Sequence, residues 1–500
     1  SKGKKKGGGW MPSRSTVKYG AVALAVAGLA LLVQNWHTFS FSVTSAKREE
    51  ANQAFMNGNL FFHQGDLSNA IQQYRTAVRA NPFNEHAWTN LGNALSTVLP
   101  NTEGQQRKAV YKEAVNAYNQ ATSVAPKFVE AHFNLGVLQH SVERLDLAIP
   151  PYLRAVELDP AHYDAWSNLG SARHKIGDIN GAVNAYQSAI EIVEQLSEEA
   201  VPAEMKSMLF YLLGTALTTL PAGRCLDAPC SEHAANKFRQ ALRLNENNEE
   251  ARHALSALVS DPNMTGASAA YIKSLFDEYA DSFDSALVAG LGYKAPELLR
   301  QAVGRFADKK SLKFNRVLDA GCGTGLCGPL FRNISETLVG VDLSEPMVEK
   351  ARVRGVYDEL YVGDIGETLD AYRQSGELFR ALDLVVAADV FVYMGDLNDM
   401  FKKVSTALRK EGLFAFTLER LDPQSKGAKD SAAAEAEVTK DDLSKGWKLR
   451  FSGRFAHTRD YVTKLAKTYN FRVVQHDNIV PRKDNGVDIP GHLVLLELTK

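Results

Sequence analysis

The first half of the chain has its hydrophobic and small residues at a long, regular spacing. Glycines recur at intervals of 34 or 44 residues, and tyrosines recur in step with them. The positions are Gly58, Gly92, Gly136, Gly170 and Gly214, with Tyr74, Tyr118, Tyr152 and Tyr186. Such a period is typical of a repeat array in which each unit is a pair of helices. We expect glycines where the two helices of a unit cross, and tyrosines between neighbouring units.

The pattern changes near residue 267, where short apolar runs begin to alternate with amphipathic stretches. Seven runs are read as strands, at residues 316–321, 337–343, 359–364, 382–391, 412–419, 472–477 and 492–499. Strands that alternate with helices favour a mostly parallel sheet covered by helices. The last two runs follow each other closely, so we expect them to pair antiparallel. The predicted fold is an all-α repeat array followed by a Rossmann-like α/β domain with seven strands.

The amino-terminal region has a different composition. Residues 1–18 contain six basic side chains and no acid, which predicts a disordered basic tail. The 15 residues that follow carry no charge, and residues 19–36 approach the roughly 20 needed to span a bilayer. We expect a single-pass membrane anchor with the basic flank on the cytoplasmic side. A cleaved signal or transit segment, which would leave a soluble mature protein, and a buried core helix are the alternatives.

Composition excludes several classes of function. A chain of 500 residues is too long for one core, so at least two domains are expected. The formal net charge is −1, so no nucleic-acid partner is expected. Cys225 and Cys230 lack a second pair of cysteines at metal-ligand spacing, so no metal site is expected. Whether these two cysteines form a loop disulfide remains open.

The loop after the first predicted strand, in VLDAGCGTGLCG, contains two overlapping fingerprints. Gly323, Gly325 and Gly328 spell the GxGxxG pattern of dinucleotide-binding folds. Gly321, Gly323 and Gly325 form a second pattern that follows Asp319 at the end of the apolar run. A carboxylate beside the loop disfavours a pyrophosphate and suits an ammonium group. This loop therefore favours a ligand with an amino-acid moiety.

Two more acids follow the next two predicted strands. Asp342 ends the second strand, where a carboxylate accepts hydrogen bonds from ribose hydroxyls. Asp364 ends the third strand, and a nicotinamide site does not need a carboxylate there. A methyl-donor site does, because the carboxylate can accept from the adenine amino group. The pattern thus favours a methyl donor.

The motifs VLDAGCGTG, VGVDLSEPMVEKA, VGDIGETL and AADVFVYMGDL together resemble class I S-adenosylmethionine-dependent methyltransferases over residues 267–500. The resemblance implies S-adenosyl-L-methionine as cofactor. It implies that the methionine part is held by Asp319, Gly321, Gly323 and Gly325. It implies that the nucleoside is held by Asp342, Leu343, Asp364 and Ile365, and that Ala388 and Asp389 lie near the methyl group.

The segments EHAWTNLGNAL, VEAHFNLGVLQ and YDAWSNLGSAR resemble the tetratricopeptide repeat, which covers residues 51–258 as about five units. The resemblance implies a superhelix that binds a protein or peptide in its groove. Asn90, Asn134 and Asn168 each lie two residues before a repeat glycine. A row of amides can pair with the backbone of an extended peptide, so these are the candidate partner-binding residues. The alternative is that asparagine is merely common at this position of the repeat.

Candidate catalytic residues lie in FSGRFAHTRDYV, after the fifth predicted strand. We expect His457 to face the methyl acceptor, and Arg454 to bind an anionic or carbonyl group of that acceptor. The alternative is that His457 caps the next helix and Arg454 pairs with a carboxylate. Asp389 and Tyr393 are further candidates for the acceptor side. A base is needed only if the acceptor is protonated at neutral pH.

Repeats followed by this domain resemble the repeat-containing predicted methyltransferases. The expected function is a methyltransferase whose repeats recruit or orient a protein partner or acceptor. Two alternatives remain. One is a membrane-tethered adaptor with a donor-sensing or inactive domain, and the other is a small-molecule methyltransferase. The sequence does not name the methyl acceptor.

Overall fold

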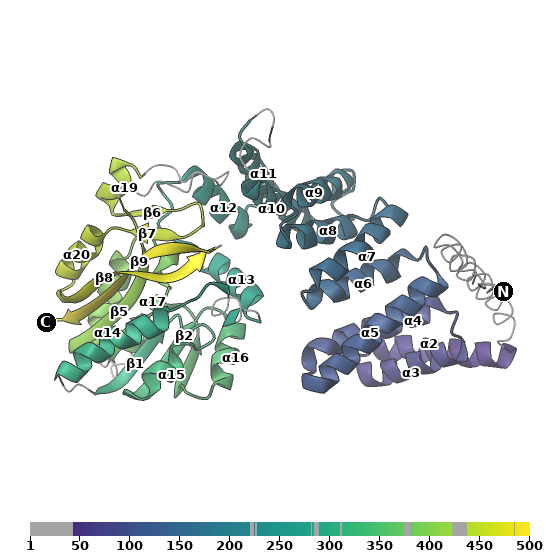
Figure 1. The fold of residues 1–500 in the computed structure, drawn as a ribbon, viewed down its shortest axis with the longest axis horizontal. Helices are drawn as coiled ribbons and strands as arrows, with labels where there is room; N and C mark the ends of the chain where they lie inside the picture. The colour runs from purple at the N-terminus through teal and green to yellow at the C-terminus, as the bar shows by residue number, and fades with distance from the viewer. Residues whose placement is uncertain are drawn as a thin grey trace, which may run out of the picture. The chain divides into compact units, whose positions relative to one another are not determined.

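The computed structural model describes residues 44–220, 225, 228–281, 283–284, 290–310, 313–374, 382–422, 438–484 and 486–500 (Figure 1). The predicted tail 1–18 and anchor 19–36 lie outside the described residues. In the part of the chain that is described, no helix has the length and apolar character needed to span a bilayer. The chain divides into two compact units, Ser1–Ile192 and Val193–Lys500.

The first unit consists of antiparallel helix pairs, as the repeat period predicts. Its helices are α2 (Ser45–His63), α3 (Leu67–Ala80), α4 (Glu85–Val98), α5 (Gly104–Val124), α6 (Val129–Ser141), α7 (Leu145–Leu158), α8 (Tyr163–Lys175) and α9 (Ile179–Val193). A short 3-10 turn, η1 (Leu99–Asn101), follows α4. Prolines 82, 126 and 160 follow α3, α5 and α7, where a residue without an amide hydrogen does not interrupt the helix.

Each repeat glycine packs against the ring of an aromatic residue in the second helix of the same pair. A Cβ on Gly58 would lie 2.6 Å from the ring of Tyr74, and a Cβ on Gly136 would lie 2.6 Å from the ring of Tyr152. Such distances leave room only for glycine. The tyrosines therefore pack against the first helix of their own unit. Tyr74 and Tyr118 also share a buried cluster with residues of the following units, in keeping with the expected place between neighbouring units.

The second unit begins with three more helices, α10 (Ala203–Thr219), α11 (Cys230–Leu244) and α12 (Glu249–Val259). In the α10–α11 pair, Phe238 takes the place of the tyrosine and contacts Gly214. Cys225 and Cys230 form a disulfide before α11, which answers the question that the sequence left open. The repeat-like pattern thus extends into the second unit, because the two compact units divide before α10.

The rest of the second unit is built on one sheet of nine strands within the described residues. The strands are β1 (Phe314–Ala320), β2 (Ser335–Asp342), β3 (Glu359–Val362), β4 (Leu382–Ala387), β5 (Leu408–Arg420), β6 (Trp447–Leu449), β7 (Phe455–His457), β8 (Phe471–Asp484) and β9 (Val487–Leu498). Their order is β3-β2-β1-β4-β5-β7-β6, and β9 pairs with both β5 and β8. Strands β1 to β5 are parallel, whereas β8 and β9 pair antiparallel as expected.

Helices cover the sheet and enclose a core on each face. They are α13 (Ala269–Tyr279), α14 (Ala295–Lys310), α15 (Gly328–Arg332), α16 (Glu345–Val353), α17 (Ile365–Gln374), α18 (Asn398–Ala407), α19 (Lys440–Lys445) and α20 (Arg459–Thr468), with the 3-10 turn η3 (Phe391–Tyr393). Val317 belongs to the core beneath α14, and its neighbour Leu318 belongs to the opposite core. This alternation is what a strand buried on both faces requires. The predicted α/β class is confirmed.

The strand prediction missed β6 and β7. Each is only three residues long, too short for a period-two pattern to be recognised. They form a hairpin that is attached to the end of β5 through Glu419 and Arg420. The segment between them, residues 450–454, reaches the candidate site described below.

Candidate functional site

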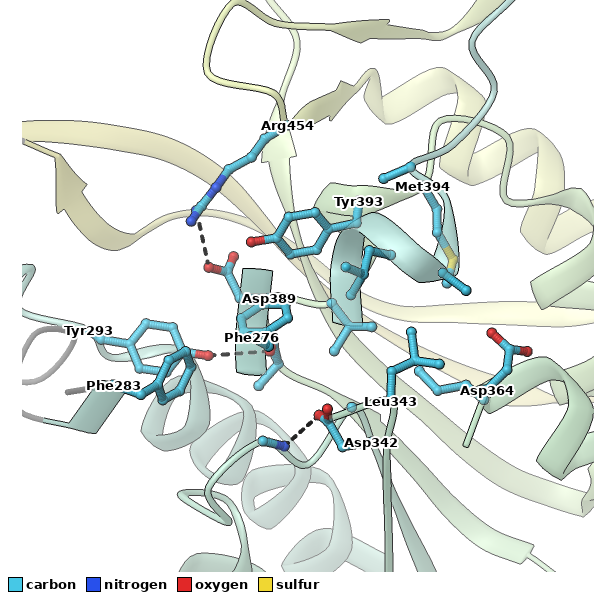
Figure 2. Close-up of a pocket in the computed structure, with 18 residues that line it drawn as sticks. Phe276, Phe283, Tyr293, Asp342, Leu343, Asp364, Asp389, Tyr393, Met394 and Arg454 are labelled. Atoms are coloured by element: carbon cyan, nitrogen blue, oxygen red, sulfur yellow. Dashed lines mark hydrogen bonds and ion pairs between the residues drawn. The ribbon is translucent and has the colours of Figure 1, made fainter. Parts of the chain in front are cut away.

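A pocket lies beyond the carboxyl ends of the parallel strands, where open α/β sheets bind ligands. Its empty volume is about 990 Å³, counting the open space at its mouth. The lining includes most of the residues singled out in the sequence: Gly321, Gly323, Asp342, Leu343, Asp364, Ile365, Ala388, Asp389 and Arg454 (Figure 2). The fold thus gathers residues from four strand ends and from the β6–β7 hairpin in one place.

The loop after β1 has a backbone that requires glycine. Gly321, Gly323 and Gly325 have φ angles of +74°, +52° and +85°, in the left-handed region that L-residues with side chains rarely adopt. A Cβ on Gly321 would also lie 2.5 Å from Val390. Gly328 has no positive φ and begins α15. The conformation of the turn follows the pattern of Gly321, Gly323 and Gly325, which starts directly after the strand.

Two carboxylates stand on the side of the pocket formed by β2 and β3. Asp342 accepts hydrogen bonds from the backbone N–H of Gly323 at 2.8 Å and of Ser344 at 3.0 Å. Burial raises its pKa, and these bonds oppose the shift. Asp364 accepts from the backbone N–H of Glu367 at 3.0 Å. Leu343 and Ile365 follow these acids directly in the sequence and form an apolar part of the lining.

Asp389 stands on the opposite side of the pocket and has a strained backbone. Its φ is +61°, which is uncommon for a residue with a side chain and often marks a functional site. The carboxylate accepts two hydrogen bonds from Arg482 Nη1, at 3.0 and 2.7 Å. Arg482 also donates to Glu419 through Nη2. Arg482 and Glu419 are not among the residues predicted from the sequence, because only the pairing of β5, β9 and β8 brings them beside Asp389.

Arg454 reaches the pocket from the segment between β6 and β7 (Figure 2). Its Nη1 atom lies 3.8 Å from Asp389 and 3.9 Å from Glu419, close enough for ion pairs but too far for hydrogen bonds. Its guanidinium carbon lies 5.8 Å from the centre of the Tyr393 ring. Arg454 therefore lines the pocket, as expected. It also pairs with carboxylates, as the alternative interpretation predicts.

Aromatic side chains form the remaining wall. Phe276 of α13 contacts Phe283 and Tyr393 edge-on, with ring centroids 5.9 and 5.6 Å apart. The Tyr293 hydroxyl donates to the carbonyl of Ala388 at 3.3 Å. Burial raises the pKa of Tyr293 and of Tyr393, so both hydroxyls are protonated at neutral pH. An apolar wall with a few polar groups is the usual make-up of a small-molecule site.

His457 does not line the pocket, so the expectation that it faces the acceptor needs correction. It is fully buried in β7, and its Nε2 lies 3.0 Å from the carbonyl oxygen of Gly395. Burial lowers its pKa to about 4, so the ring is neutral at pH 7. The alternative of a helix cap is also wrong, because Thr458 caps α20 by accepting from the N–H of Tyr461.

Asp319 and Gly325 belong to the loop but do not line the pocket either. Asp319 Oδ2 accepts from the Tyr357 hydroxyl at 2.6 Å, while its Oδ1 is buried without a hydrogen-bond partner. Burial raises the pKa of this carboxyl to about 7. A direct contact between Asp319 and a ligand ammonium is therefore not supported by this geometry. Gly325 supports the turn, with its N–H bonded to the carbonyl of Cys322.

The three candidate asparagines of the repeats are in different environments. Asn90 donates to Asn59 at 2.9 Å, and Asn134 donates to Asn93 at 3.0 Å. Asn168 lacks this contact, because Val137 stands at the position that Asn59 and Asn93 occupy in their repeats. The side-chain amides of Asn90 and Asn134 therefore each donate a hydrogen bond to another repeat residue. Peptide binding by Asn90, Asn134 and Asn168 stays a prediction.

Comparison with known proteins agrees with this architecture. Residues 291–476 match the family described as a methyltransferase domain. Residues 58–97, 110–142 and 142–197 match families of tetratricopeptide repeats. The chain therefore contains tetratricopeptide repeats followed by a methyltransferase domain.

Particular relatives cover only parts of the chain. The ubiquinone biosynthesis O-methyltransferase of Bartonella tribocorum is 30% identical over 127 residues, which is 23% of this chain and 50% of the relative. The enzyme of the same name from Chelativorans sp. is 32% identical over 107 residues, 21% of this chain and 41% of the relative. The chain thus spans half or less of the length of these curated relatives.

Two solved structures each cover less than half of this chain. A tetratricopeptide-repeat protein described as having an unusual peptide-binding site has a TM-score of 0.32 and 21% identity, and covers 43% of this chain and 97% of its own. An S-adenosylmethionine-dependent methyltransferase from Clostridium acetobutylicum has a TM-score of 0.32 and 19% identity, and covers 45% of this chain and 100% of its own.

Proposed function

We propose that this methyltransferase uses S-adenosyl-L-methionine as its methyl donor. The observation that carries the proposal is the pocket at the ends of β1 to β4. It combines a glycine turn in the left-handed conformation with Asp342 and Asp364 on neighbouring strands. A nicotinamide cofactor has no need of the second carboxylate. When bound, the donor supplies a sulfonium-activated methyl group, so positioning of the reactants contributes most of the catalysis.

The residues present fit such a donor. Asp342 is oriented by two backbone amides and can accept from ribose hydroxyls. Asp364 can accept from the adenine amino group, and Leu343 and Ile365 supply apolar surface for the ring. A Cβ on Gly323 would find only Phe283 nearby, at 3.8 Å, so the loop leaves open space beside the pocket. These features support the donor-binding roles that the sequence predicts.

The repeats have a separate proposed role. Tetratricopeptide repeats commonly bind proteins or peptides along a groove, so we propose that the first unit recruits or orients a protein partner. A small-molecule methyltransferase that uses its repeats for assembly remains the second candidate. It is favoured by the small, largely apolar pocket.

Calorimetric titration tests the proposed donor. A 45–500 fragment is titrated with S-adenosylmethionine, S-adenosylhomocysteine and NADH, beside Asp342→Ala and the exposed control Asp399→Ala. We expect the two sulfur compounds to bind, with affinity reduced at least about tenfold by Asp342→Ala alone, since hydrogen bonds to a charged group contribute about 1.5–3 kcal/mol. Binding of NADH alone would refute the proposed donor, and binding of none of the three ligands would favour an adaptor.

We also propose that residues 19–36 attach the protein to a membrane, on the basis of their uncharged sequence and basic flank. The test is extraction of the expressed full chain with alkaline carbonate. Retention of the full chain in the membrane pellet, with release of the 45–500 fragment, is the expected result. Release of both would indicate that the segment is not an anchor.

A further inference from the structure

An unusual group of charges lies on the acceptor side of the pocket. The guanidinium groups of Arg450, Arg454 and Arg482 lie close to the carboxylates of Asp389 and Glu419. Arg482 and both acids are nearly inaccessible to solvent. Water screens the charges of this group poorly.

Arg454 is the member of this group whose hydrogen-bonding capacity is unused. Arg482 donates to Asp389 and Glu419, and Arg450 donates to Glu419 and to the carbonyl of Arg420. The guanidinium of Arg454 takes part in none of the hydrogen bonds found among the described residues, and its Nη1 is buried. Buried polar groups without a partner are rare, so this one needs an explanation. Arg454 also lines the pocket, so an anion bound there can accept hydrogen bonds from its guanidinium.

The described lining of the pocket offers no free base to deprotonate an acceptor. Among the described lining residues, the ionisable side chains are Asp342, Asp364, Asp389, Tyr293, Tyr393 and Arg454. Asp342 and Asp364 lie on the proposed donor side, and Asp389 is held by Arg482. The two tyrosines stay protonated at neutral pH. An acceptor that is already ionised when it binds needs none of these groups as a base.

We propose that the methyl acceptor is a carboxylate that binds Arg454 and leaves as a methyl ester. The inference rests on the proposed methyl donor. A carboxylate is ionised at neutral pH and matches the planar fork of a guanidinium. One carboxylate oxygen forms a bond to the methyl carbon with its lone pair, while the methyl–sulfur bond breaks and the sulfur keeps that electron pair. The products are a neutral ester and a neutral thioether, and no proton has to be removed.

Electrostatics favours this acceptor over a neutral one. The donor's sulfonium is a cation, and the guanidinium of Arg454 in the same pocket repels it. A carboxylate that contacts both cations removes the repulsion and aligns its oxygen with the methyl group. The attraction weakens as the ester forms, because the ester carries no charge, and this helps the product to leave.

Methyl transfer to two panels of acids tests the proposal and separates two sources of the carboxylate. The 45–500 protein is incubated with methyl-labelled S-adenosylmethionine. One panel contains free aromatic and aliphatic monocarboxylic acids, each beside its amide. The other contains short peptides with free or amidated carboxyl ends. We expect label that mild alkali releases as methanol, from acids of one panel and from no amide.

Variants then assign the effect to the guanidinium. Arg454→Gln is expected to lower kcat/KM for the acid by about 100-fold or more, since it removes charge-assisted hydrogen bonds. Arg454→Lys should recover part of the loss. The exposed control Arg352→Gln, whose ion pair is with Glu349, should behave as wild type. Calorimetric affinity for the donor should not be lower in any of the three variants than in the wild type.

Several outcomes would overturn the carboxylate assignment. They are label that resists alkali, full activity of Arg454→Gln, and no ester from any acid by a protein that binds the donor. The last result would leave donor binding intact, so a failure of this proposal can be told apart from a failure of the proposed function.

Discussion

At the scale of single residues, three histidines of the second unit stand out: His457 and His492, which are buried, and His476, which is partly buried. Burial lowers the pKa of His457 and His476 to about 4, and of His492 to about 3. The rings of His476 and His492 lie 4.7 Å apart on β8 and β9, and Arg459 opposes the protonation of both. All three are therefore neutral in the folded protein at pH 7.

These histidines predict a loss of stability in mild acid. Below about pH 6.5 the unfolded chain binds protons that the folded chain cannot bind, so the free energy of unfolding falls as pH falls from 6.5 toward 4. Each histidine contributes up to about 1.4 kcal/mol per pH unit. Urea unfolding between pH 7.5 and 5 measures this slope, and His492→Phe should make it shallower. An unchanged slope in that variant would show that His492 titrates normally.

A second prediction at this scale concerns the repeat glycines. Gly136→Ala places a methyl group against the ring of Tyr152, so we expect the first unit to lose about 1–3 kcal/mol of stability. Tyr152→Leu provides space for the methyl group. The double variant should therefore lose less than the sum of the two single variants in a thermodynamic cycle. Strict additivity would mean that the two positions do not compete for the same volume.

At the scale of elements, helix α12 holds the segment that carries Arg454. His253 Nε2 lies 2.7 Å from the carbonyl oxygen of Gly453, and the His253 ring stacks on Tyr271 of α13 with centroids 4.1 Å apart. Gly453 has a φ of +76°, a conformation that suits glycine directly before Arg454. A helix at the end of the repeat pattern thus positions a residue that lines the pocket.

Hydrogen exchange can test this contact without knowledge of the acceptor. The amides of Arg450 and Gly453 are bonded within the turn, at 2.8 and 2.9 Å. We expect His253→Leu to speed their exchange by about tenfold or more. The reason is that the loss of one hydrogen bond, about 1–1.5 kcal/mol, shifts the local opening equilibrium by about a factor of ten. His253→Gln, which keeps a donor, should restore part of the protection. Equal exchange in all three proteins would show that α12 does not hold the turn.

At the scale of the whole molecule, the compact units do not follow the boundary between repeats and enzyme that the sequence predicts. Ala257 of α12 packs with Trp447, Leu449 and Phe455 of the β6–β7 hairpin in one buried cluster. The predicted domain boundary near residue 267 would therefore separate parts that share a core.

Truncation tests this division. We expect a 195–500 fragment to fold, and a 267–500 fragment to melt several degrees lower, because it exposes the apolar side of the hairpin and loses the His253 contact. Differential scanning calorimetry of both fragments measures the difference. Identical melting temperatures would mean that α10–α12 do not contribute to the stability of the methyltransferase domain.

Much of this architecture can be read from local sequence. The repeat period and the glycine turn depend on residues close together in the chain, and both are seen in the structure. The strands β6 and β7 could not be predicted, because three residues carry too little pattern. Arg482 and Glu419 could not be recognised as partners, because they are 63 residues apart and meet only through sheet pairing.

The sequence alone was sufficient to predict the two kinds of domain. It was also sufficient to predict that Asp342 and Asp364 lie close together, since acids at the ends of parallel strands meet at one edge of the sheet. The sequence was not sufficient to decide whether Arg454 or His457 lines the pocket. Positions three apart along an extended segment face opposite sides, and the direction of each depends on how the hairpin packs. Only the packing of β5, β7 and β8 placed Arg454 at the pocket without a hydrogen-bond acceptor for its guanidinium among the described residues. The sequence could not show this, because the acids near Arg454 come from segments distant in the chain.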